Sequence, residues 1–369
     1  MLFLLSEFVC GQVRIRLFSG SEAGLAILTV ISGKYEMDTY SDHSFEIAPG
    51  EIVIISRVNN RLNIKTRRSA GITCDSLLVT GISGDDSFSL RVNGILRYYS
   101  GDLNCYCDLG ALMLINICDM ESYIAGVVKA EGGSGRNIEY FKTQAVIART
   151  YMYRYFDKHI TDHFNLCDDT HCQVFQGITD DSTIIRAALD TKGEVILGSD
   201  SALIIAAFHS NCGGETAPSE SVWLTGEPYL RRVTDPFCTA SRNAKWQKSI
   251  SLNEWIAYLG KAGYTGDNSN PELFNLSQAT RLTEYKTGGF SVSLRQIRTD
   301  LNLRSTFFSV RAAGDSVLLS GRGYGHGVGL CQEGAMSMAL KGFDYRQIIN
   351  FYYTGVHLAD ITEAVAREK

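Results

Sequence analysis

The sequence is poor in proline and in positive charge. Only 5 of its 369 residues are proline, whereas 35 are glycine, which indicates many turns and close approaches of the backbone. Lysine and arginine together number 35 against 40 acidic residues, which gives a formal net charge of −5. A chain of this charge lacks the basic surface that nucleic acid requires, so we expect no nucleic-acid partner.

The sequence also lacks a long apolar segment, low-complexity runs and internal repeats. A membrane-spanning helix needs about 20 apolar residues, and no segment reaches that length. The apolar start MLFLL is interrupted by Ser6 and Glu7, and no basic residues precede it. We interpret residues 1–12 as an incomplete remnant of a secretory signal peptide, with a first edge strand as the alternative.

The remaining composition is that of a folded chain. Hydrophobic residues make up 45% and charged residues 20%, which suffices for a sizeable core and argues against disorder. The 18 tyrosines and 17 phenylalanines suit strands and sugar-binding clefts. Ten cysteines in a chain of this length exclude a disulfide-rich miniprotein but do not decide the compartment.

Residues 13–118 have the pattern of a β-rich region. Short alternating apolar runs are separated by glycine and aspartate clusters, and Asn93–Gly94 is typical of a hairpin turn. The clearest expected strands are residues 13–18, 25–30, 51–58, 76–82, 87–99 and 111–117. Further along, residues 181–192, 252–259, 297–301 and 345–353 are expected to form helices. The fold class is therefore α+β.

One stretch, Tyr123 to Tyr155, combines a lone carboxylate with a long amphipathic helix. An apolar run ends at Glu131, four residues of glycine and serine follow, and apolar residues then recur at steps of three and four from Ile138. Two interpretations are open at this point. Glu131 belongs to a site at a glycine-rich loop, or it only stabilises the N-terminus of a helix.

A second motif is the sequence GRGYGHGVGLCQ, in which glycines alternate around His326. It lacks the Lys-Ser/Thr pair of a phosphate-binding loop and the strand–helix–strand context of a dinucleotide site. Alternating glycines allow the backbone to pass close to a neighbour, and they leave His326 without a packing shell. This pattern favours a functional role for His326.

A third motif contains the metal-binding residue types Cys167, His171 and Cys172 within six positions. Thiolates and imidazoles at this density suit Zn²⁺, and His163 lies nearby in the sequence. A disulfide between Cys167 and Cys172 and simple packing are the alternatives.

Two other arrangements have the right residue types but the wrong context. Ser210, His209 and Asp235 could supply a hydrolase triad, but no G-x-S-x-G elbow is present. Cys212 or Cys331 with His326 could supply a thiol nucleophile, but neither cysteine has an activating neighbourhood.

From about residue 119 to residue 355 the motifs occur in an order that resembles the SpoIID/LytB family of stage II sporulation protein D and amidase enhancers. The matching blocks are YIAGVVKAE, FKTQAVIARTY, HCQVFQG, FHSNCGGETAPSESVW, PYLRRV, LRSTFF and GRGYGHGVGLCQEGAMSMALKG. A poorly matching insert lies at about 240–290, residues 13–118 resemble the family's β-rich lead-in, and 356–369 form a tail. The resemblance implies a mixed α+β fold with a central cleft.

The resemblance also implies roles for individual residues. Glu131 corresponds to the catalytic acid. The residues expected to line a glycan cleft are Lys142, Gln144, Arg149, Gln173, His209, Ser210, Gly213, Gly214, His326 and Gln332. Some family members are similar in having a zinc site of cysteine and histidine near this region, which supports Cys167, His171 and Cys172 as zinc ligands.

The activity implied is that of a peptidoglycan lytic transglycosylase. Hydrolysis of a glycosidic bond ordinarily needs two carboxyl groups. A lytic transglycosylase needs one, because the 6-hydroxyl of muramic acid attacks within the same molecule and closes an anhydro ring. Glu131 would first act as acid and then as base, and no cofactor is required for this step.

Partners and location follow from the same resemblance. We expect binding to peptidoglycan strands, preferably stripped of peptide, and an extracytoplasmic location in the periplasm, at the cell surface or in the intermembrane space. The alternative function is a non-catalytic glycan-binding enhancer of a cell-wall amidase. Two departures from the family pattern are the Gly-Gly-Ser-Gly sequence after Glu131, which suggests a mobile loop, and Cys212, which offers a further metal or thiol contact.

Overall fold

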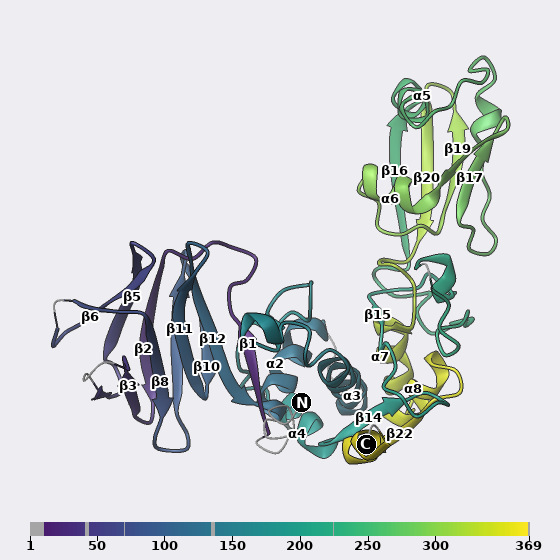
Figure 1. Cartoon of the computed structure of the whole chain (residues 1–369). Coiled ribbons are helices and arrows are strands. Elements are labelled where there is room, and N and C mark those ends of the chain that lie inside the picture. Colours follow the sequence, from purple (N-terminus) through teal and green to yellow (C-terminus); the bar gives the residue numbers. More distant parts are fainter. Residues whose placement is uncertain (1–10, 41–43, 70, 134–136, 224, 368–369) are drawn as a thin grey trace. The chain divides into compact units, whose positions relative to one another are not determined.

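The computed structural model describes residues 11–40, 44–69, 71–133, 137–223 and 225–367, and Figure 1 shows the chain. The chain divides into two compact units, residues 1–194 and residues 195–369. We call these the first and the second unit. Most of the expected signal remnant lies outside the described residues, and Gln12 already begins a strand. In the described part of the chain, no helix is both long enough and apolar enough to cross a membrane.

Two antiparallel sheets form most of the first unit. One has the order β13-β1-β12-β11-β8-β3-β4, and the other has the order β10-β9-β2-β5-β6-β7. Their strands are β1 (Gln12–Arg16), β2 (Leu25–Ser32), β3 (Tyr35–Asp38), β4 (Ser44–Ile47), β5 (Ile52–Val58), β6 (Arg61–Thr66), β7 (Ile72–Cys74), β8 (Ser76–Gly81), β9 (Ser87–Val92), β10 (Ile95–Ser100), β11 (Asp102–Asp108), β12 (Ala111–Asp119) and β13 (Leu166–Cys167). The six strand regions expected from alternation all appear. The chain has an α+β fold with a β-rich N-terminal region.

The hairpin at Asn93–Gly94 and the core between the sheets follow from local sequence. Asn93 has φ 49° and Gly94 has φ 82°, the left-handed pair that closes β9 and β10 with the correct twist. Tyr35 of one sheet meets Phe88 of the other edge to face, with ring centroids 5.7 Å apart. Buried side chains occur at alternate positions of most strands, so each of these strands has one face toward the core.

Three helices follow the sheets: α2 (Met120–Glu131), α3 (Ile138–Arg154) and α4 (Ser182–Asp190). Each begins at an Asp or Asn whose side chain accepts a hydrogen bond from a backbone N–H of the first turn. The predicted helix from Ile138 is therefore confirmed. A short 3₁₀ turn, η1 (Ile160–Asp162), comes after α3.

The β-rich region and these helices belong to one unit, so the division of the chain falls at residue 194 and not near residue 118. Strand β1 pairs antiparallel with β12 and parallel with β13, which joins the start of the chain to Cys167. A row of aromatic rings also connects the sheets to the helices. The ring centroid of Phe175 lies 6.0 Å from that of Tyr99 and 5.1 Å from that of Tyr123 in α2. Sheets and helices thus share one core.

The second unit contains a small lobe and a base that carries the glycine-rich loop (Figure 1). The lobe consists of β16 (Lys245–Ser251), α5 (Leu252–Lys261), η3 (Pro271–Phe274), β17 (Glu284–Thr287), β18 (Phe290–Ser293), α6 (Leu294–Asp300), β19 (Phe308–Ala313) and β20 (Ser316–Arg322). The base consists of β14 (Glu194–Leu197), β15 (Phe208–His209), η2 (Ser219–Ser221), β21 (Leu330–Cys331), α7 (Gln332–Leu340), α8 (Tyr345–Tyr352), β22 (His357–Asp360) and α9 (Ile361–Arg367).

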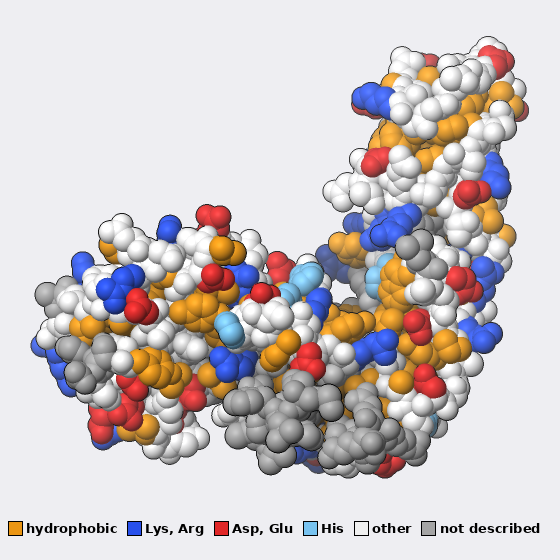
Figure 2. All heavy atoms as spheres, in the orientation of Figure 1, with side chains coloured by type: hydrophobic (Ala, Val, Ile, Leu, Met, Phe, Trp, Pro, Cys, Tyr) orange, Lys and Arg blue, Asp and Glu red, His pale blue; other side chains and the backbone are white. Residues whose placement is uncertain are grey.

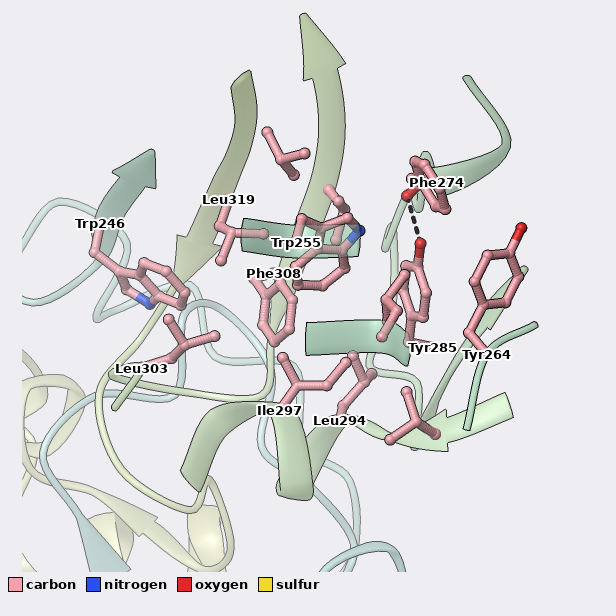
Figure 3. Packing of buried hydrophobic residues seen from close by; sticks show 14 residues of the cluster. Trp246, Trp255, Tyr264, Phe274, Tyr285, Leu294, Ile297, Leu303, Phe308 and Leu319 are labelled. Carbon is pink, nitrogen blue, oxygen red and sulfur yellow. Dashed lines mark hydrogen bonds between the residues drawn. The ribbon is translucent and has the colours of Figure 1, made fainter. Parts of the chain in front are cut away.

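The lobe has its own hydrophobic core, drawn in Figure 3. Trp255 of α5 is fully buried and meets Tyr285 of β17 edge to face at 5.4 Å, while the Tyr285 hydroxyl donates to the Phe274 carbonyl oxygen at 2.9 Å. The insert expected at about 240–290 is longer in the structure. It extends to residue 322, because β20 pairs with both β16 and β19 to complete the sheet.

The base is held by short strands. Strand β14 pairs with β22. Strand β15, Phe208–His209, pairs in parallel with Leu330–Cys331. The expected helix at 345–353 appears as α8, which begins with a capping box at Asp344 and Gln347.

Candidate functional site

Glu131 is the last residue of α2, and its carboxyl group is half-buried. Its Oε1 accepts a hydrogen bond of 2.8 Å from the backbone N–H of Val174. Burial raises the pKa of Glu131 above the ordinary value, and the Val174 hydrogen bond opposes this in part. The alternative that Glu131 stabilises a helix N-terminus is wrong, because it lies at the C-terminal end, where the helix dipole disfavours an anion.

The segment that carries Val174 packs across α2 and positions the acid. Gln173 is buried, and its Oε1 accepts a hydrogen bond of 3.3 Å from the Tyr123 hydroxyl. A Cβ at Gly126 of α2 would lie 2.4 Å from the Phe175 ring and 2.5 Å from the Gly177 carbonyl oxygen. This close fit requires glycine at position 126, and it fixes the distance between Glu131 and the 173–177 segment.

The loop after Glu131 is described only in part. Gly132 accepts a hydrogen bond of 2.9 Å from the Tyr140 hydroxyl through its carbonyl oxygen, and Gly133 has φ 63°. Residues 134–136 lie outside the described residues, so the expected mobility of the Gly-Gly-Ser-Gly loop stays a prediction.

Two predicted substrate-binding residues of α3 have different surroundings. The Lys142 ammonium lies 3.2 Å from Glu139 and 3.3 Å from Asp190, so it bridges α3 and α4 while part of its side chain stays exposed. Gln144 is buried in the middle of α3. Lys142 can reach a ligand by exchanging ion-pair partners, whereas Gln144 lies among packed side chains.

Arg149 is fully buried, and its guanidinium group is surrounded by acceptors. It pairs with both oxygens of Glu121 in α2 and donates to the carbonyl oxygens of Ala188 at 3.0 Å and Glu194 at 3.2 Å. A bidentate pair of this kind is geometrically specific and replaces the water that both charges lose on burial. We therefore assign Arg149 to packing of the three helices and not to substrate contact.

The predicted metal ligands Cys167, His171 and Cys172 lie together with His159. Their ligand atoms all fall within 4.8 Å of one another. Cys167 Sγ is 3.6 Å from His171 Nδ1, and Cys172 Sγ is 3.6 Å from His159 Nε2. Bonds of about 2.3 Å to sulfur and about 2.05 Å to nitrogen give a tetrahedral S···N edge of about 3.6 Å. The four residues thus fit Zn²⁺, and both cysteines are unbridged.

The fourth residue of the cluster is His159, which was not predicted from sequence. His163, which lies near the cluster in the sequence, is not part of it. His163 has a left-handed φ of 67° and is exposed, whereas the turn η1 brings His159 back beside Phe164, with stacked rings 4.7 Å apart. The adjacent residues His171 and Cys172 both reach the cluster because they lie in a turn and not in a strand. The Cys172 thiol, followed by the His171 ring, lowers the pKa of Cys167.

The β-rich region helps to fix this cluster. Asp168, next to Cys167, is buried and accepts hydrogen bonds from the backbone N–H groups of Phe18 at 2.6 Å and Ser19 at 2.9 Å. Its Oδ2 also pairs with Arg97 at 2.7 Å. The N-terminal strands therefore anchor the loop that carries the cysteines.

In the second unit, the two predicted histidines lie side by side, with ring centroids 5.5 Å apart. Val328 donates its N–H to His326 Nδ1 at 3.0 Å, and His326 Nε2 lies 2.9 Å from the Phe208 carbonyl oxygen. The carbonyl oxygen can only accept, so Nε2 carries the proton and the ring is neutral. Burial lowers the pKa of His326 to about 4, which agrees with that assignment.

His209 is almost completely buried and is also neutral. Its Nδ1 lies 3.1 Å from the Val328 carbonyl oxygen and therefore carries the proton, while its Nε2 is buried without a hydrogen-bond partner among the described residues. Burial, followed by the neighbouring His326, lowers the pKa of His209 well below the ordinary value. Both rings serve to fix the loop, because their protons go to backbone carbonyl groups.

The glycines of this region allow the close approaches predicted for them. Gly323, Gly325, Gly327 and Gly329 have φ between 71° and 113°. Gly213 and Gly214 also have positive φ, and a Cβ at Gly213 would lie 2.6 Å from Arg322.

Two further predicted residues of the second unit are Ser210 and Gln332. Ser210 is half-buried, and its hydroxyl accepts a hydrogen bond from Asn243 Nδ2 at 3.3 Å. Gln332 is the first residue of α7.

A pocket of about 160 Å³ opens beside His326. Its walls include Trp223, whose ring centroid lies 6.0 Å from that of His326, and the lobe residues Arg295 and Arg298. An aromatic ring and two guanidinium groups can hold a ring-shaped ligand that bears an acid. None of these three residues was predicted from sequence. Trp223 ends a block that matches the family, whereas the two arginines lie in the lobe, away from the motifs that were given a role. Histidine side chains reach the visible surface in both units (Figure 2).

The triad considered from sequence does not form. Asp235 accepts hydrogen bonds from the Tyr352 hydroxyl at 3.0 Å and from the Cys212 thiol at 3.2 Å, while His209 is bonded to Val328. The predicted catalytic and substrate-binding residues are divided between the two units. The first unit contains Glu131, Lys142, Gln144, Arg149 and Gln173. His209, Ser210, Gly213, Gly214, His326 and Gln332 belong to the second.

Comparison with known proteins gives the family. The SpoIID family model, described as stage II sporulation protein, matches residues 109–197, which contain Glu131 and the cysteine–histidine cluster. Stage II sporulation protein D of Bacillus amyloliquefaciens is 30% identical over 263 residues, covering 66% of this chain and 74% of the relative. The chain belongs to the SpoIID family.

Two other relatives extend the likeness. An uncharacterised protein of Brachyspira hyodysenteriae is 30% identical over 337 residues, which cover 89% of each chain. The amidase enhancer of Bacillus subtilis is 28% identical over 289 residues, covering 64% of this chain and 40% of that protein. The likeness to this SpoIID chain thus extends beyond residues 109–197 in both directions.

Proposed function

We propose that this SpoIID chain is a lytic transglycosylase that cleaves the MurNAc–GlcNAc bonds of bacterial peptidoglycan to give 1,6-anhydroMurNAc ends. The observation that carries the proposal is Glu131, a half-buried carboxyl group with a raised pKa, held by the Val174 N–H. Burial raises this pKa, and the Val174 hydrogen bond lowers it in part.

A protonated Glu131 can donate its proton to the glycosidic oxygen as the bond breaks. The resulting carboxylate can then take the proton of the 6-hydroxyl group as it attacks C1 of the same sugar. The Val174 hydrogen bond to Oε1 fixes the orientation of the carboxyl group for this proton transfer. Because the nucleophile belongs to the substrate, no water has to be captured and no second carboxylate is needed.

The second unit supplies groups suited to a glycan. The Trp223 and His326 rings can stack on a sugar face, and Arg295 and Arg298 can attract the lactyl carboxylate of muramic acid. The neutral state of His326 is consistent with binding through its ring face, since both nitrogens bond to the backbone.

Zn²⁺ at His159, Cys167, His171 and Cys172 is part of the proposal. Four protein ligands fill a tetrahedral ion, so such a site is structural. Zinc there would fix the turn that leads into Gln173 and Val174, and the acid–base step would be left to Glu131 alone. An extracytoplasmic location also belongs to the proposal, because the substrate lies outside the cytoplasmic membrane.

The test is mass spectrometry of the products from peptide-free glycan strands. Wild-type protein is expected to release anhydro ends, and Glu131→Gln is expected to lose about 10²–10⁴-fold in rate while still binding the strands. Glu22→Gln is the matched control, because Glu22 is an exposed carboxylate of the same unit. Cleavage by Glu131→Gln at the wild-type rate would exclude the mechanism, and reducing ends in place of anhydro ends would indicate a hydrolase.

The likeness to the Bacillus subtilis amidase enhancer favours a second candidate, a glycan-binding protein that activates a cell-wall amidase. In that case wild-type and Glu131→Gln proteins would both bind glycan, neither would release anhydro ends, and both would increase peptide release by an added amidase. The same product analysis therefore separates the two candidates.

A further inference from the structure

A second group of metal-binding side chains lies in the second unit and shares no residue with the proposed reaction. Cys212, Asp235, Cys238 and Cys331 are all buried, and their ligand atoms lie within 4.8 Å of one another. They come from three separate parts of the chain: the segment after β15, the turn at 235–238, and the junction of β21 and α7. We propose that these four residues bind one divalent metal ion, with Zn²⁺ as the expected ion.

The distances suit a tetrahedral ion. Zinc–sulfur bonds of about 2.3 Å give S···S edges of about 3.8 Å, and a carboxylate oxygen gives S···O edges of about 3.6 Å. Cys212 Sγ lies 3.4 Å from Cys238 Sγ and 3.2 Å from Asp235 Oδ2. These edges are within a few tenths of an ångström of the ideal values. Zinc accepts three thiolates and one carboxylate, whereas harder cations such as Mg²⁺ avoid thiolates.

The burial of Asp235 is the second observation that indicates a cation. Its exposed fraction is 0%, and no lysine or arginine forms an ion pair with it in the part of the chain that the structure describes. A carboxylate surrounded by three thiols and removed from water is costly unless a positive charge is near. A metal ion between the four side chains supplies that charge.

The surrounding donors have the arrangement expected around metal ligands. Cys331 Sγ accepts from the backbone N–H groups of Cys212 at 3.3 Å and Gly334 at 3.4 Å, at the N-terminus of α7. Asp235 Oδ2 accepts from the Tyr352 hydroxyl at 3.0 Å, and its Oδ1 accepts from the Phe237 N–H at 2.8 Å. These donors orient the ligands and offset the excess negative charge of four anions around one divalent ion.

Two other uses of the cysteines fit less well. A disulfide has sulfurs about 2.05 Å apart, whereas Cys212 and Cys238 are unbridged at 3.4 Å, and a disulfide would leave Cys331 and the buried Asp235 unexplained. A [4Fe–4S] cluster binds each ligand through a different iron at the corners of a cube, which requires more space than four mutually contacting ligand atoms enclose.

The metal would join the elements that carry the paired histidines. Cys331 is the register partner of His209 in the parallel β15–β21 pair, and Cys212 lies three residues after His209. Strands of two residues have little stability of their own. A metal that links them to the 235–238 turn and to α7 would take the place of a longer sheet in fixing His209 and His326.

The experiment is native mass spectrometry of the full chain, purified with reductant and zinc. Cys238→Ala is expected to hold one zinc ion fewer than the wild type, and Cys107→Ala, which changes a half-exposed thiol outside both clusters, is expected to hold the wild-type number. Cys172→Ala should lose the ion of the other cluster independently. Equal zinc content in Cys238→Ala and the wild type would overturn the proposal, as would a Cys212–Cys238 disulfide in peptide mapping of unreduced protein.

A second measurement covers the case in which Cys238→Ala does not fold. Co²⁺ is added to the zinc-free Cys172→Ala protein, in which the site of the second unit keeps all four ligands. Intense thiolate-to-cobalt absorption together with the visible bands of tetrahedral Co²⁺ is expected, and its absence would overturn the proposal. Both readouts are independent of glycan cleavage, so their failure is distinguishable from a failure of the proposed function.

Discussion

At the scale of single residues, environment separates carboxylates that look alike in the sequence. Glu121 and Glu131 lie at the two ends of α2. Glu121 is paired with the buried Arg149, whereas the Glu131 carboxyl group accepts a hydrogen bond from the Val174 N–H and has a raised pKa. A half-buried carboxyl group with a raised pKa is suited to proton transfer, whereas a bidentate ion pair is suited to packing.

The raised pKa of Glu131 predicts both a pH profile and a stability effect. In the proposed reaction Glu131 must be protonated to donate its proton. Cleavage should therefore fall as the pH rises through the pKa of Glu131 in the folded protein, which lies above the ordinary glutamate value. Burial disfavours the ionised form of Glu131 in the folded protein. The contribution of protonated Glu131 to folding stability is therefore fully present below the pKa of Glu131 in the unfolded chain, and it is lost as the pH rises through the higher pKa in the folded protein. Glu131→Gln should therefore unfold at a higher temperature than the wild type at neutral pH.

Thermal unfolding at several pH values checks the stability effect. The difference between wild type and Glu131→Gln should disappear at a pH below the ordinary pKa of glutamate. Glu22→Gln should show no such pH-dependent difference, because Glu22 is exposed. A variant that is less stable than the wild type at neutral pH would contradict the environment described for Glu131.

Arg149→Met should destabilise the first unit by about 3–5 kcal/mol, because it leaves the Glu121 carboxylate buried without its partner. The double variant Arg149→Met/Glu121→Met should recover most of that loss. Lys142→Met is the matched comparison on the same helix, with an expected cost of about 0–1 kcal/mol, since its ion pairs are partly exposed. Urea denaturation measures all three. Similar costs for Arg149→Met and Lys142→Met would contradict the packing role of Arg149.

At the scale of elements, the glycine-rich loop shows how a short motif depends on distant backbone. Gly329 has φ 71°, and a Cβ there would lie 2.1 Å from the Ala207 carbonyl oxygen. The close approach allows β15 and β21 to pair although each has only two residues. The alternating glycines therefore serve strand pairing as well as the placement of His326.

Gly329→Ala should cost more than the ~1 kcal/mol typical of a left-handed glycine, because strain and a backbone clash add. Gly342→Ala is the matched control, since Gly342 has φ 90° but a Cβ there would have nothing within 4 Å. Thermal unfolding of the two variants separates conformational strain from the clash. Equal losses would show that the approach to Ala207 does not matter for stability.

At the scale of the whole molecule, each of the two units contributes part of the family's motif set. The first unit contains Glu131 and the cysteine–histidine cluster suited to zinc. The second unit contains His209 and His326 and the cluster of three cysteines and Asp235. The lobe from β16 to β20 adds a core of its own to the second unit. It also supplies Arg295 and Arg298 to the pocket beside His326.

Trp255→Ala should destabilise this lobe by about 3–5 kcal/mol, because it removes a fully buried indole from the lobe core (Figure 3). Hydrogen exchange should become faster in residues 245–322 and stay unchanged in α3. Leu273→Ala, at an exposed position of the same lobe, should change stability by less than about 0.5 kcal/mol. Faster exchange throughout the chain would contradict an independent core in the lobe.

Local sequence patterns were sufficient to predict the secondary-structure elements and to identify the motifs. Alternation located the strands of the β-rich region, and the three- and four-residue spacing located α3, because these periods follow from backbone geometry alone. Motif order was enough to place Glu131, Cys167, His171 and Cys172 in the correct family context. Residue type and spacing along the chain carry that information directly.

Which residues meet from distant parts of the chain depends on tertiary packing. His159 completes the first cluster through a turn, Arg149 is buried by three helices, and Cys212, Cys238 and Cys331 come together across more than one hundred positions. The boundary at residue 194 and the extent of the lobe depend on β1 and β20 pairing with strands far along the chain. Such contacts arise from packing between distant segments, and they leave no periodic pattern in a single sequence that could predict them.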